Sequence, residues 1–367
     1  MEGSAEVEDG NHGCRWAGEP PSLPWQATRP GIDGAMPSIP SSASAMPSIP
    51  SRTYFTVSLC ELRNGARGTK FTGMNRIALL IVATICFSLR ATAETKLPMD
   101  TVFKGRERFD QLVQRAVSED WKSLPIGRRT AAVGRALVGT PYKSFTLEID
   151  DRVEAASVNF TGLDCWTFFE ASLAFARMLD EPRENWTPQT MLRYIESDRY
   201  RGGACTGSYL SRLHYLEEWL NDNARRGYLS DLTRDLGGVR VSHAADEMTI
   251  NWHSYRYLRA NPDLRSGIRT MENRVASLPM YHIPKSRVAS IEPKIQSGDI
   301  IGITTKDRGG IGTSHVGLAV RDDRGVLRFM HASSPHNYGH VVLDTRLSDY
   351  LRHFKSDVGI IVARPLK

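Results

Sequence analysis

The sequence is poor in cysteine, with five cysteines among 367 residues. So few thiols cannot build the disulfide framework that holds many small secreted proteins together. The chain also has no block of consecutive lysine and arginine residues, although its formal net charge is +6. A small positive excess that is spread along the chain gives no electrostatic footprint for nucleic acid. These absences argue against a disulfide scaffold and against a nucleic-acid-binding arm.

Long hydrophobic runs are also missing, and the apolar run at 77–89 is too short for a comfortable transmembrane helix. It follows Asn75 and Arg76 and precedes the triplet Ala91-Thr92-Ala93. A positive start, an apolar middle and small residues at the end are the three parts of a secretory signal peptide. We therefore expect a signal peptide at 74–93, no stable membrane span after cleavage, and a secreted protein in the periplasm of a Gram-negative bacterium.

The segment 1–73 is rich in proline and serine and contains a short imperfect repeat, at 35–44 and 45–54. Such a stretch has too little apolar surface to offset the conformational entropy of the chain, so we expect disorder. Because a signal peptide belongs at a chain start, Met74 is a candidate initiator, with 1–73 as upstream sequence. A genuine extension or an N-terminal anchor is the alternative. Residues 94–367 are expected to form a single catalytic domain.

The expected fold class is α+β, with a helical N-terminal half packed on a C-terminal sheet. Helical periodicity covers 106–138, a further helix begins at Cys165, and another carries an apolar stripe that includes Leu210 and Leu220. Five short β-branched runs predict a five-stranded, mostly antiparallel sheet. These runs lie at 297–304, 314–321, 326–333, 340–347 and 358–365.

Cys165 lies where a turn becomes an apolar helix, directly after Asp164. Asp164 is a good N-cap, so Cys165 should be the first helical residue. Free N–H groups and the positive end of the helix dipole stabilise an anion there, and thiolate is the nucleophilic form of cysteine. The alternative is a small buried hydrophobe, as many free cysteines are.

Two histidines on neighbouring predicted strands favour the interpretation of Cys165 as a nucleophile. Alternation at 314–321 puts His315 on one face with Gly317 and Ala319, which leaves room for a helix to approach. If the hairpin is centred near Asp323, His331 falls opposite His315. His315 would then act as the base and His331 as its orienter, and the N–H of Cys165 would be an oxyanion donor.

These residues resemble a known superfamily, the NlpC-type, papain-like cell-wall cysteine peptidases. The motifs are "GTPY", "LDC", the turn Gly298-Asp299, "SHVG" and "HAS". The resemblance implies a papain-like fold with Cys165 as nucleophile, His315 as base and His331 as third member. "LDCWTFFE", "SRLHY" and "YHIPKSRVASIEPKIQSGDIIGITT" resemble the N-acetylmuramoyl-L-alanine amidase-like branch more narrowly. Trp166 departs from the superfamily, which has serine there, and Tyr142 lies further from Cys165 than is usual.

The resemblance implies hydrolysis of the amide between N-acetylmuramic acid and L-alanine in peptidoglycan or released muropeptides, with no cofactor and no metal. It also suggests residues that contact the substrate. These are Tyr142, Asp164, Trp166, Ser211, Arg212, His214 and Ser314. Arg212 would clamp a carboxylate, with Ser211 and His214 at the rim of the cleft. A solvated helix flank is the alternative for "SRLHY".

Other functions remain open from the sequence. A stem-peptide endopeptidase, an acyltransferase and a non-catalytic wall-binding module share the implied fold. His331, His336, His340 and Asp344 could form a zinc site, but they lack the ligand-on-helix spacing of zinc peptidases. A disulfide between Cys165 and Cys205 would consume the nucleophile.

Overall fold

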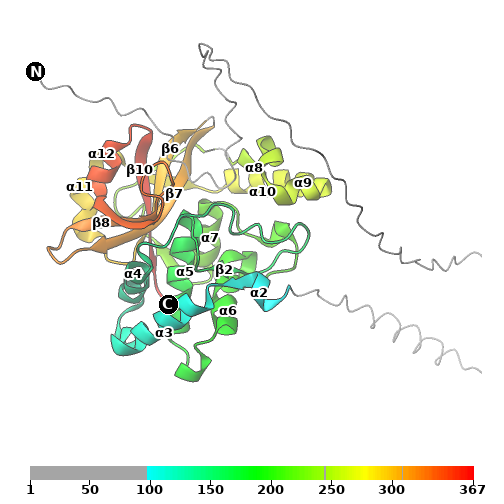
Figure 1. Ribbon diagram of the computed structural model, residues 1–367. Coiled ribbons are helices and arrows are strands. Elements are labelled where there is room, and N and C mark those ends of the chain that lie inside the picture. Colours follow the sequence, from blue (N-terminus) through cyan, green and yellow to red (C-terminus); the bar gives the residue numbers. More distant parts are fainter. Residues whose placement is uncertain (1–96, 244, 308) are drawn as a thin grey trace, which may run out of the picture. The chain divides into compact units, whose positions relative to one another are not determined.

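The computed structural model describes residues 97–367 except 244 and 308, and these belong to one compact unit. The Pro/Ser-rich segment 1–73 and the predicted signal peptide 74–93 lie outside the described residues. Helices and strands are both present in a mixed α+β arrangement, and Figure 1 shows helices of the N-terminal half beside the C-terminal sheet. Among the described helices, none is long and apolar enough to cross a bilayer.

The first three long helices of the N-terminal half, which begin at Arg106, Ile126 and Cys165, start where the sequence predicts. The expected periodicity at 106–138 becomes two helices, because Pro125 precedes the second and starts it. The helices of this half are α2 (Met99–Val102), α3 (Arg106–Ser118), α4 (Ile126–Leu137), α5 (Cys165–Met178), α6 (Pro188–Arg199) and α7 (Leu216–Arg225).

All five expected strands form and are joined antiparallel to their neighbours. Three shorter strands extend them to an eight-stranded sheet in the part of the chain that the structure describes, in the order β4-β5-β10-β6-β7-β8-β9, with β3 pairing β10. The strands are β3 (Leu229–Asp231), β4 (Val239–Val241), β5 (Met280–Pro284), β6 (Ile300–Asp307), β7 (Gly310–Arg321), β8 (Leu327–Ala332), β9 (Val341–Arg346) and β10 (Asp357–Pro365). Strands β1 (Phe103–Lys104) and β2 (Val158–Asn159) form a separate parallel pair.

Helices cover both faces of this sheet. Val316 and Leu318 of β7 join a core with α4 and α5, whereas Ala319 and Phe329 join a second core with α11 (Lys285–Ile291) and α12 (Leu347–His353). Period-two alternation produces this division, because successive side chains of a strand point to opposite faces. The sheet is therefore buried on both sides in its central strands.

One predicted helix is shorter than expected. Leu210 was expected on a helical stripe with Leu220, but it lies in a 3-10 turn, η5 (Tyr209–Ser211), and helix α7 begins only at Leu216. The backbone between them is extended, with a ψ of 144° at Arg212. Arg212 is held in buried ion pairs, which override the local helical pattern.

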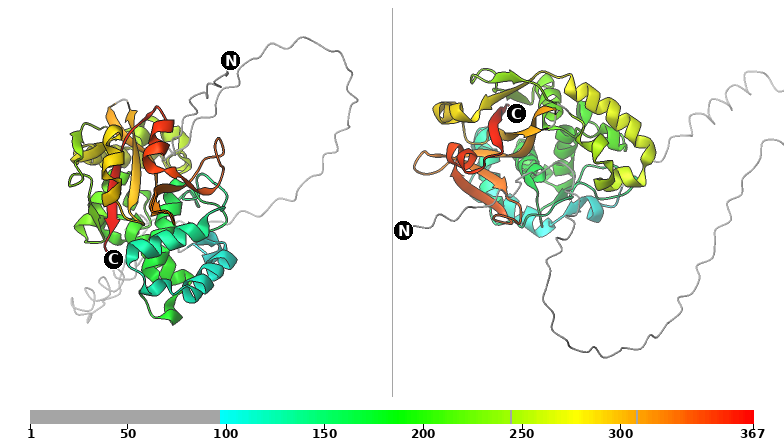
Figure 2. Two further views of the ribbon diagram at one scale, coloured as in Figure 1. Left: turned by 90° about the vertical axis from the view of Figure 1, so that its left-hand side faces the viewer. Right: turned by 90° about the horizontal axis from the view of Figure 1, so that it is seen from above.

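A small helical segment between β4 and β5 has no counterpart in the sequence prediction. It contains α8 (Glu247–Ile250), α9 (Arg256–Ala260) and α10 (Arg265–Ala276), which bury a third apolar cluster around Tyr257 and Ile268. Figures 1 and 2 show this segment at the opposite end of the domain from α11 and α12. The segment also contacts the loop that leads to α5, as described below.

Candidate functional site

Helix α5 begins at Cys165, as the sequence predicts, and Asp164 is its N-cap. The Asp164 carboxylate accepts a hydrogen bond from the Thr167 N–H at 2.8 Å, and the Thr167 hydroxyl accepts one from the Asp164 N–H at 3.0 Å. This reciprocal capping box fixes the first turn of the helix. The Cys165 side chain is thus held at the positive end of a 14-residue helix of about four turns.

The Cys165 side chain is less accessible than expected. Its residue is 3% exposed and joins the core between the sheet and α5. In its burial, Cys165 therefore matches the alternative of a small buried residue, although it also lies at the helix start that the nucleophile needs.

The start of α5 is joined through backbone hydrogen bonds to the end of β8, close to His331. The Leu163 N–H donates to the Pro141 carbonyl at 3.0 Å, and the Val341 N–H donates to the neighbouring Thr140 carbonyl at 2.9 Å. Val341 is in turn the register partner of Ala332, the residue after His331. Helix α5 also packs directly on β7 and β8. The backbone thereby places Cys165 at the end of the sheet that carries His331.

The two imidazoles contact each other, with 2.8 Å between His315 Nε2 and His331 Nδ1. The predicted register, with His331 directly opposite His315, is wrong. The observed pairing of Leu318 with Met330 centres the hairpin one residue later than expected. The histidines meet on a diagonal across β7 and β8, which is within reach of their long side chains.

Gly317 makes that diagonal contact possible. A Cβ atom at this position would lie 2.5 Å from the Met330 carbonyl oxygen and 2.9 Å from the His331 Cβ. The small residue therefore leaves room for the His331 ring, which stacks on Phe329. The face of the sheet with His315 and His331 is covered by Tyr350 of α12.

Asp344 is a further member of the site that sequence reasoning considered only as a metal ligand. His331 Nε2 lies 3.2 Å from the Asp344 carboxylate. Burial alone would raise the pKa of Asp344, but hydrogen bonds from His331 and the Thr345 N–H bring it below its usual value. The signal was available, because Asp344 lies two residues beyond Val342, the register partner of His331, and so on the same face.

These contacts decide which ring nitrogens carry protons. An ionised Asp344 can only accept, so the proton of a neutral His331 lies on Nε2 and its Nδ1 is an acceptor. His315 Nε2 must then donate to His331, which leaves the lone pair of a neutral His315 on Nδ1. Among the described residues this buried Nδ1 has no hydrogen-bond partner. The arrangement Asp344–His331–His315 therefore ends in a basic nitrogen that can take up a proton.

A cavity of about 440 Å³ adjoins the other end of this relay. His331 and Asp344 form part of its wall, together with Tyr338 and Tyr350. The Tyr338 hydroxyl interacts with Asp344, and that carboxylate raises the pKa of Tyr338. The cavity lets solvent approach the carboxylate, which stabilises its charge.

The other residues expected at the site separate into two groups. The Tyr142 N–H donates to the Gly339 carbonyl, and Tyr142 pairs with Leu163, two residues before Cys165. Ser314 is half-buried on β7 beside His315. Of these residues, Tyr142 and the N-cap Asp164 lie at the start of α5. Trp166 instead packs into the core against Trp219, so the structure contradicts its expected contact with substrate.

The "SRLHY" side chains are occupied within the protein. Arg212 is 5% exposed and donates to both oxygens of Glu154, at 2.9 and 2.7 Å, so it cannot clamp a substrate carboxylate. Ser211 donates to the Ser208 carbonyl at 2.6 Å. His214 is bonded to the Tyr209 carbonyl, and burial holds its pKa well below the usual value. The predicted rim of the cleft is therefore a buried structural cluster.

The two alternatives that used other side-chain pairings find no support in the geometry. Cys165 and Cys205 are both free of disulfides. Within the described ranges, no group of three histidine, cysteine, aspartate or glutamate side chains is arranged to hold a metal ion. Burial raises the pKa of the Cys205 thiol, which donates to the Glu154 carbonyl.

Comparison with known proteins adds independent information. A family model described as N-acetylmuramoyl-L-alanine amidase-like matches residues 132–360. A crystal structure of an N-acetylmuramoyl-L-alanine amidase from Bacteroides uniformis is similar, with a TM-score of 0.60 and 30% identity over 66% of this chain and 99% of that one. No curated protein matches the chain.

Two other solved structures are similar. A Bacteroides fragilis protein that carries the name of a xylanase is 34% identical, with a TM-score of 0.57 over 64% of this chain and 99% of that one. A Legionella pneumophila protein is 19% identical, with a TM-score of 0.53 over 71% of this chain and 95% of that one, and this likeness concerns the fold alone.

Proposed function

The chain belongs to the N-acetylmuramoyl-L-alanine amidase-like family, and we propose that it hydrolyses the amide between N-acetylmuramic acid and L-alanine with Cys165 as nucleophile. The observation that carries this proposal is the relay from Asp344 through His331 to the basic Nδ1 of His315. Helix α5, which begins at Cys165, packs on β7 and β8, the strands that carry the two histidines. A thiol, a base and an orienting chain are the parts that thiol acyl chemistry needs.

In the proposed reaction, His315 Nδ1 takes the proton of the Cys165 thiol, and the thiolate attacks the lactyl carbonyl carbon. The N–H groups at the start of α5 point out of the helix and stabilise the oxyanion that develops. The His315 imidazolium then gives its proton to the departing amine of L-alanine, which leaves a thioester. Water then attacks the thioester with His315 again as base. This step releases the lactyl carboxylate and regenerates the Cys165 thiol.

The same proposal extends to fold and location. A nucleophile at a helix N-terminus that packs on an antiparallel sheet with the base is the papain-like, NlpC-type arrangement that the motifs suggest. The substrate is a polymer outside the cytoplasm, so a secreted, periplasmic enzyme with a removable signal peptide fits it. No cofactor takes part in the proposed steps.

The decisive experiment is mass spectrometry of defined muropeptides after incubation with residues 94–367. Release of a free L-alanyl peptide and an intact sugar supports the amidase. Loss of a dipeptide from the stem would instead identify a stem-peptide endopeptidase, and unchanged muropeptides would leave a non-catalytic binding module.

Two variants distinguish a specific role of Cys165 as nucleophile from a general effect of losing a thiol. Cys165→Ala should abolish turnover, and because the thiol is buried the substitution should also cost about 1 kcal/mol of stability. Cys205→Ala is the matched control, because Cys205 is half-buried and bonded to a backbone carbonyl elsewhere. Full activity in a folded Cys165→Ala protein would refute the assignment.

A further inference from the structure

Phe145 combines two unfavourable features in one residue. Its φ is +60°, in the left-handed region that bulky side chains rarely adopt, and its residue is 50% exposed. A single exposed phenylalanine is common on protein surfaces, but an exposed phenylalanine with a strained backbone calls for an explanation. Strained backbone at a side chain that does not help the core persists mainly where the side chain has a task.

The position of Phe145 is set by contacts to both sides of Cys165. Two residues before it, the Lys143 N–H donates to the Leu163 carbonyl at 3.1 Å. One residue after it, the Thr146 hydroxyl lies 3.4 Å from the hydroxyl of Thr167, the capping-box residue of α5. Phe145 is therefore held between two segments that contact the start of the nucleophile helix.

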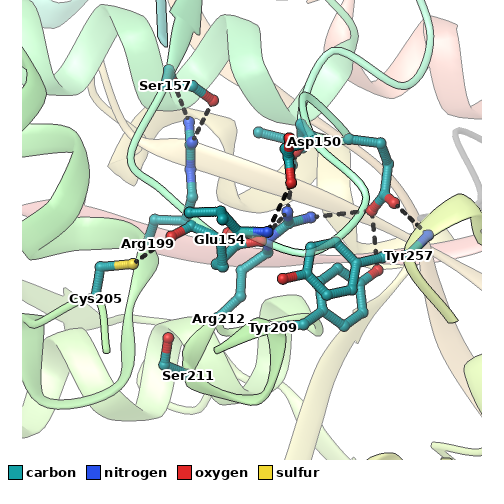
Figure 3. Close-up of polar contacts among 12 residues, drawn as sticks. Asp150, Glu154, Ser157, Arg199, Cys205, Tyr209, Ser211, Arg212 and Tyr257 are labelled. Carbon is teal, nitrogen blue, oxygen red and sulfur yellow. Dashed lines mark hydrogen bonds and ion pairs between the residues drawn. The ribbon is translucent and has the colours of Figure 1, made fainter. Parts of the chain in front are cut away.

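The loop that carries Phe145 is also fixed from its far side. Arg212 donates to the Leu147 carbonyl at 3.0 Å and pairs with Glu154 further along the loop, and Figure 3 shows this cluster. The Tyr257 N–H of the inserted helical segment donates to the Glu148 carboxylate at 3.1 Å. Buried ion pairs of this kind hold a single arrangement, so the left-handed turn at Phe145 is imposed by its surroundings.

We propose that Phe145 is a specificity residue of the amidase, and that its ring stacks on the pyranose of the muramoyl group. This inference rests on the proposed function. A phenyl ring offers a flat apolar face and no hydrogen bonds, which matches the C–H face of a pyranose better than the polar backbone of a stem peptide. The ring would thereby select substrates in which the amide is still attached to sugar.

The test compares two substrates with the same scissile amide, muramoyl-tripeptide and lactoyl-tripeptide, which lacks the sugar. Phe145→Ala should raise KM for muramoyl-tripeptide about ten-fold, a typical value for one lost aromatic contact, and leave KM for lactoyl-tripeptide unchanged. Phe145→Tyr should retain the wild-type KM for both. An equal rise for both substrates, or no rise for either, overturns the proposal for Phe145.

Two further variants exclude a purely structural explanation. Phe145→Gly relieves the left-handed strain, so its Tm should rise while its KM for muramoyl-tripeptide matches that of Phe145→Ala. Val239→Ala is the matched control, because Val239 is 39% exposed on β4, at the opposite edge of the sheet from β9, and should change neither KM. If the wild-type protein cleaves neither substrate, the proposed function itself fails, which is a different result from equal effects of Phe145→Ala.

Discussion

Asp344 shows how a single side chain can control the chemistry of a residue it does not touch. Its carboxylate accepts from His331, and His331 accepts from His315, so the charge of Asp344 keeps the lone pair of His315 on Nδ1. The effect is transmitted by which ring nitrogens of His331 and His315 carry a proton, and it needs no direct contact between Asp344 and His315. A substitution that preserves shape but not charge should therefore be costly.

We expect Asp344→Asn to fold normally and to lower kcat by about 10²–10⁴-fold, the range for loss of a base or its orienter. The carboxamide can donate to His331 Nε2, which reverses both hydrogen bonds and leaves a proton on His315 Nδ1. Steady-state kinetics on a defined muropeptide measure the loss. Asp349→Asn is the control, since Asp349 lines the same cavity but pairs with Arg352. An unchanged kcat in Asp344→Asn would contradict the relay.

At the scale of elements, the β7–β8 hairpin is what brings the histidines together. Its strands are joined by a turn in which the Asp322 N–H bonds to the Val326 carbonyl, with Gly325 at a φ of +77°. Gly317 then gives the diagonal pair its room. The site is therefore sensitive to a methyl group on the strand, and not only to its own polar atoms.

Gly317→Ala should destabilise the protein by about 1–3 kcal/mol and reduce kcat, because the new Cβ would press against the Met330 carbonyl and the His331 Cβ. Thermal unfolding and kinetics on the same preparation measure both effects. Gly302→Ala on the neighbouring strand β6 is the comparison, since the one tight contact of its Cβ would be with the flexible end of Leu216, while Ile361 and Thr313 would lie at an ordinary 3.5 Å. It should keep wild-type kcat. Equal kcat values in the two variants would show that the space at Gly317 does not position His331.

Whether an element could be predicted from the sequence depends on how far along the chain its determining contacts lie. The capped start at Asp164 and Cys165 and the alternation around His315 were predictable, because both depend on neighbours within a few residues. The hairpin centre was missed by one residue, which moves each strand partner by two, because turn geometry sets the centre and a polar stretch permits several. The helix expected through Arg212 was wrong because partners far along the chain, such as Glu154, determine its conformation.

At the scale of the whole molecule, the sheet also carries a buried charge close to the base. Asp357 lies at a β-bulge in β10, is 5% exposed, and has one carboxylate oxygen without a hydrogen-bond partner among the described residues. Burial raises its pKa to about 6, although electrostatic interactions with His315 and Lys285 partly offset this. The ionisation of Asp357 should therefore affect both the free energy of unfolding and the electrostatic environment of His315.

The direction of the resulting pH dependence can be derived. An aspartate titrates near 3.9 in the unfolded chain and near 6 here, so the folded state binds the proton more tightly. The stability that this group contributes is fully present below about pH 4 and is lost as the pH rises through 6. A shift of about two pKa units corresponds to roughly 3 kcal/mol at most.

Asp357→Asn removes this titration, so the variant should gain stability relative to the wild type between pH 4 and pH 8, by up to roughly 3 kcal/mol. Urea unfolding of both proteins at each pH measures the difference. Taking a difference between two proteins cancels the other titrating groups, including Asp198, whose pKa burial also raises to about 6. If the two proteins keep a constant separation from pH 4 to pH 8, Asp357 is ionised in the folded state throughout, and its carboxylate must have a partner that compensates its burial.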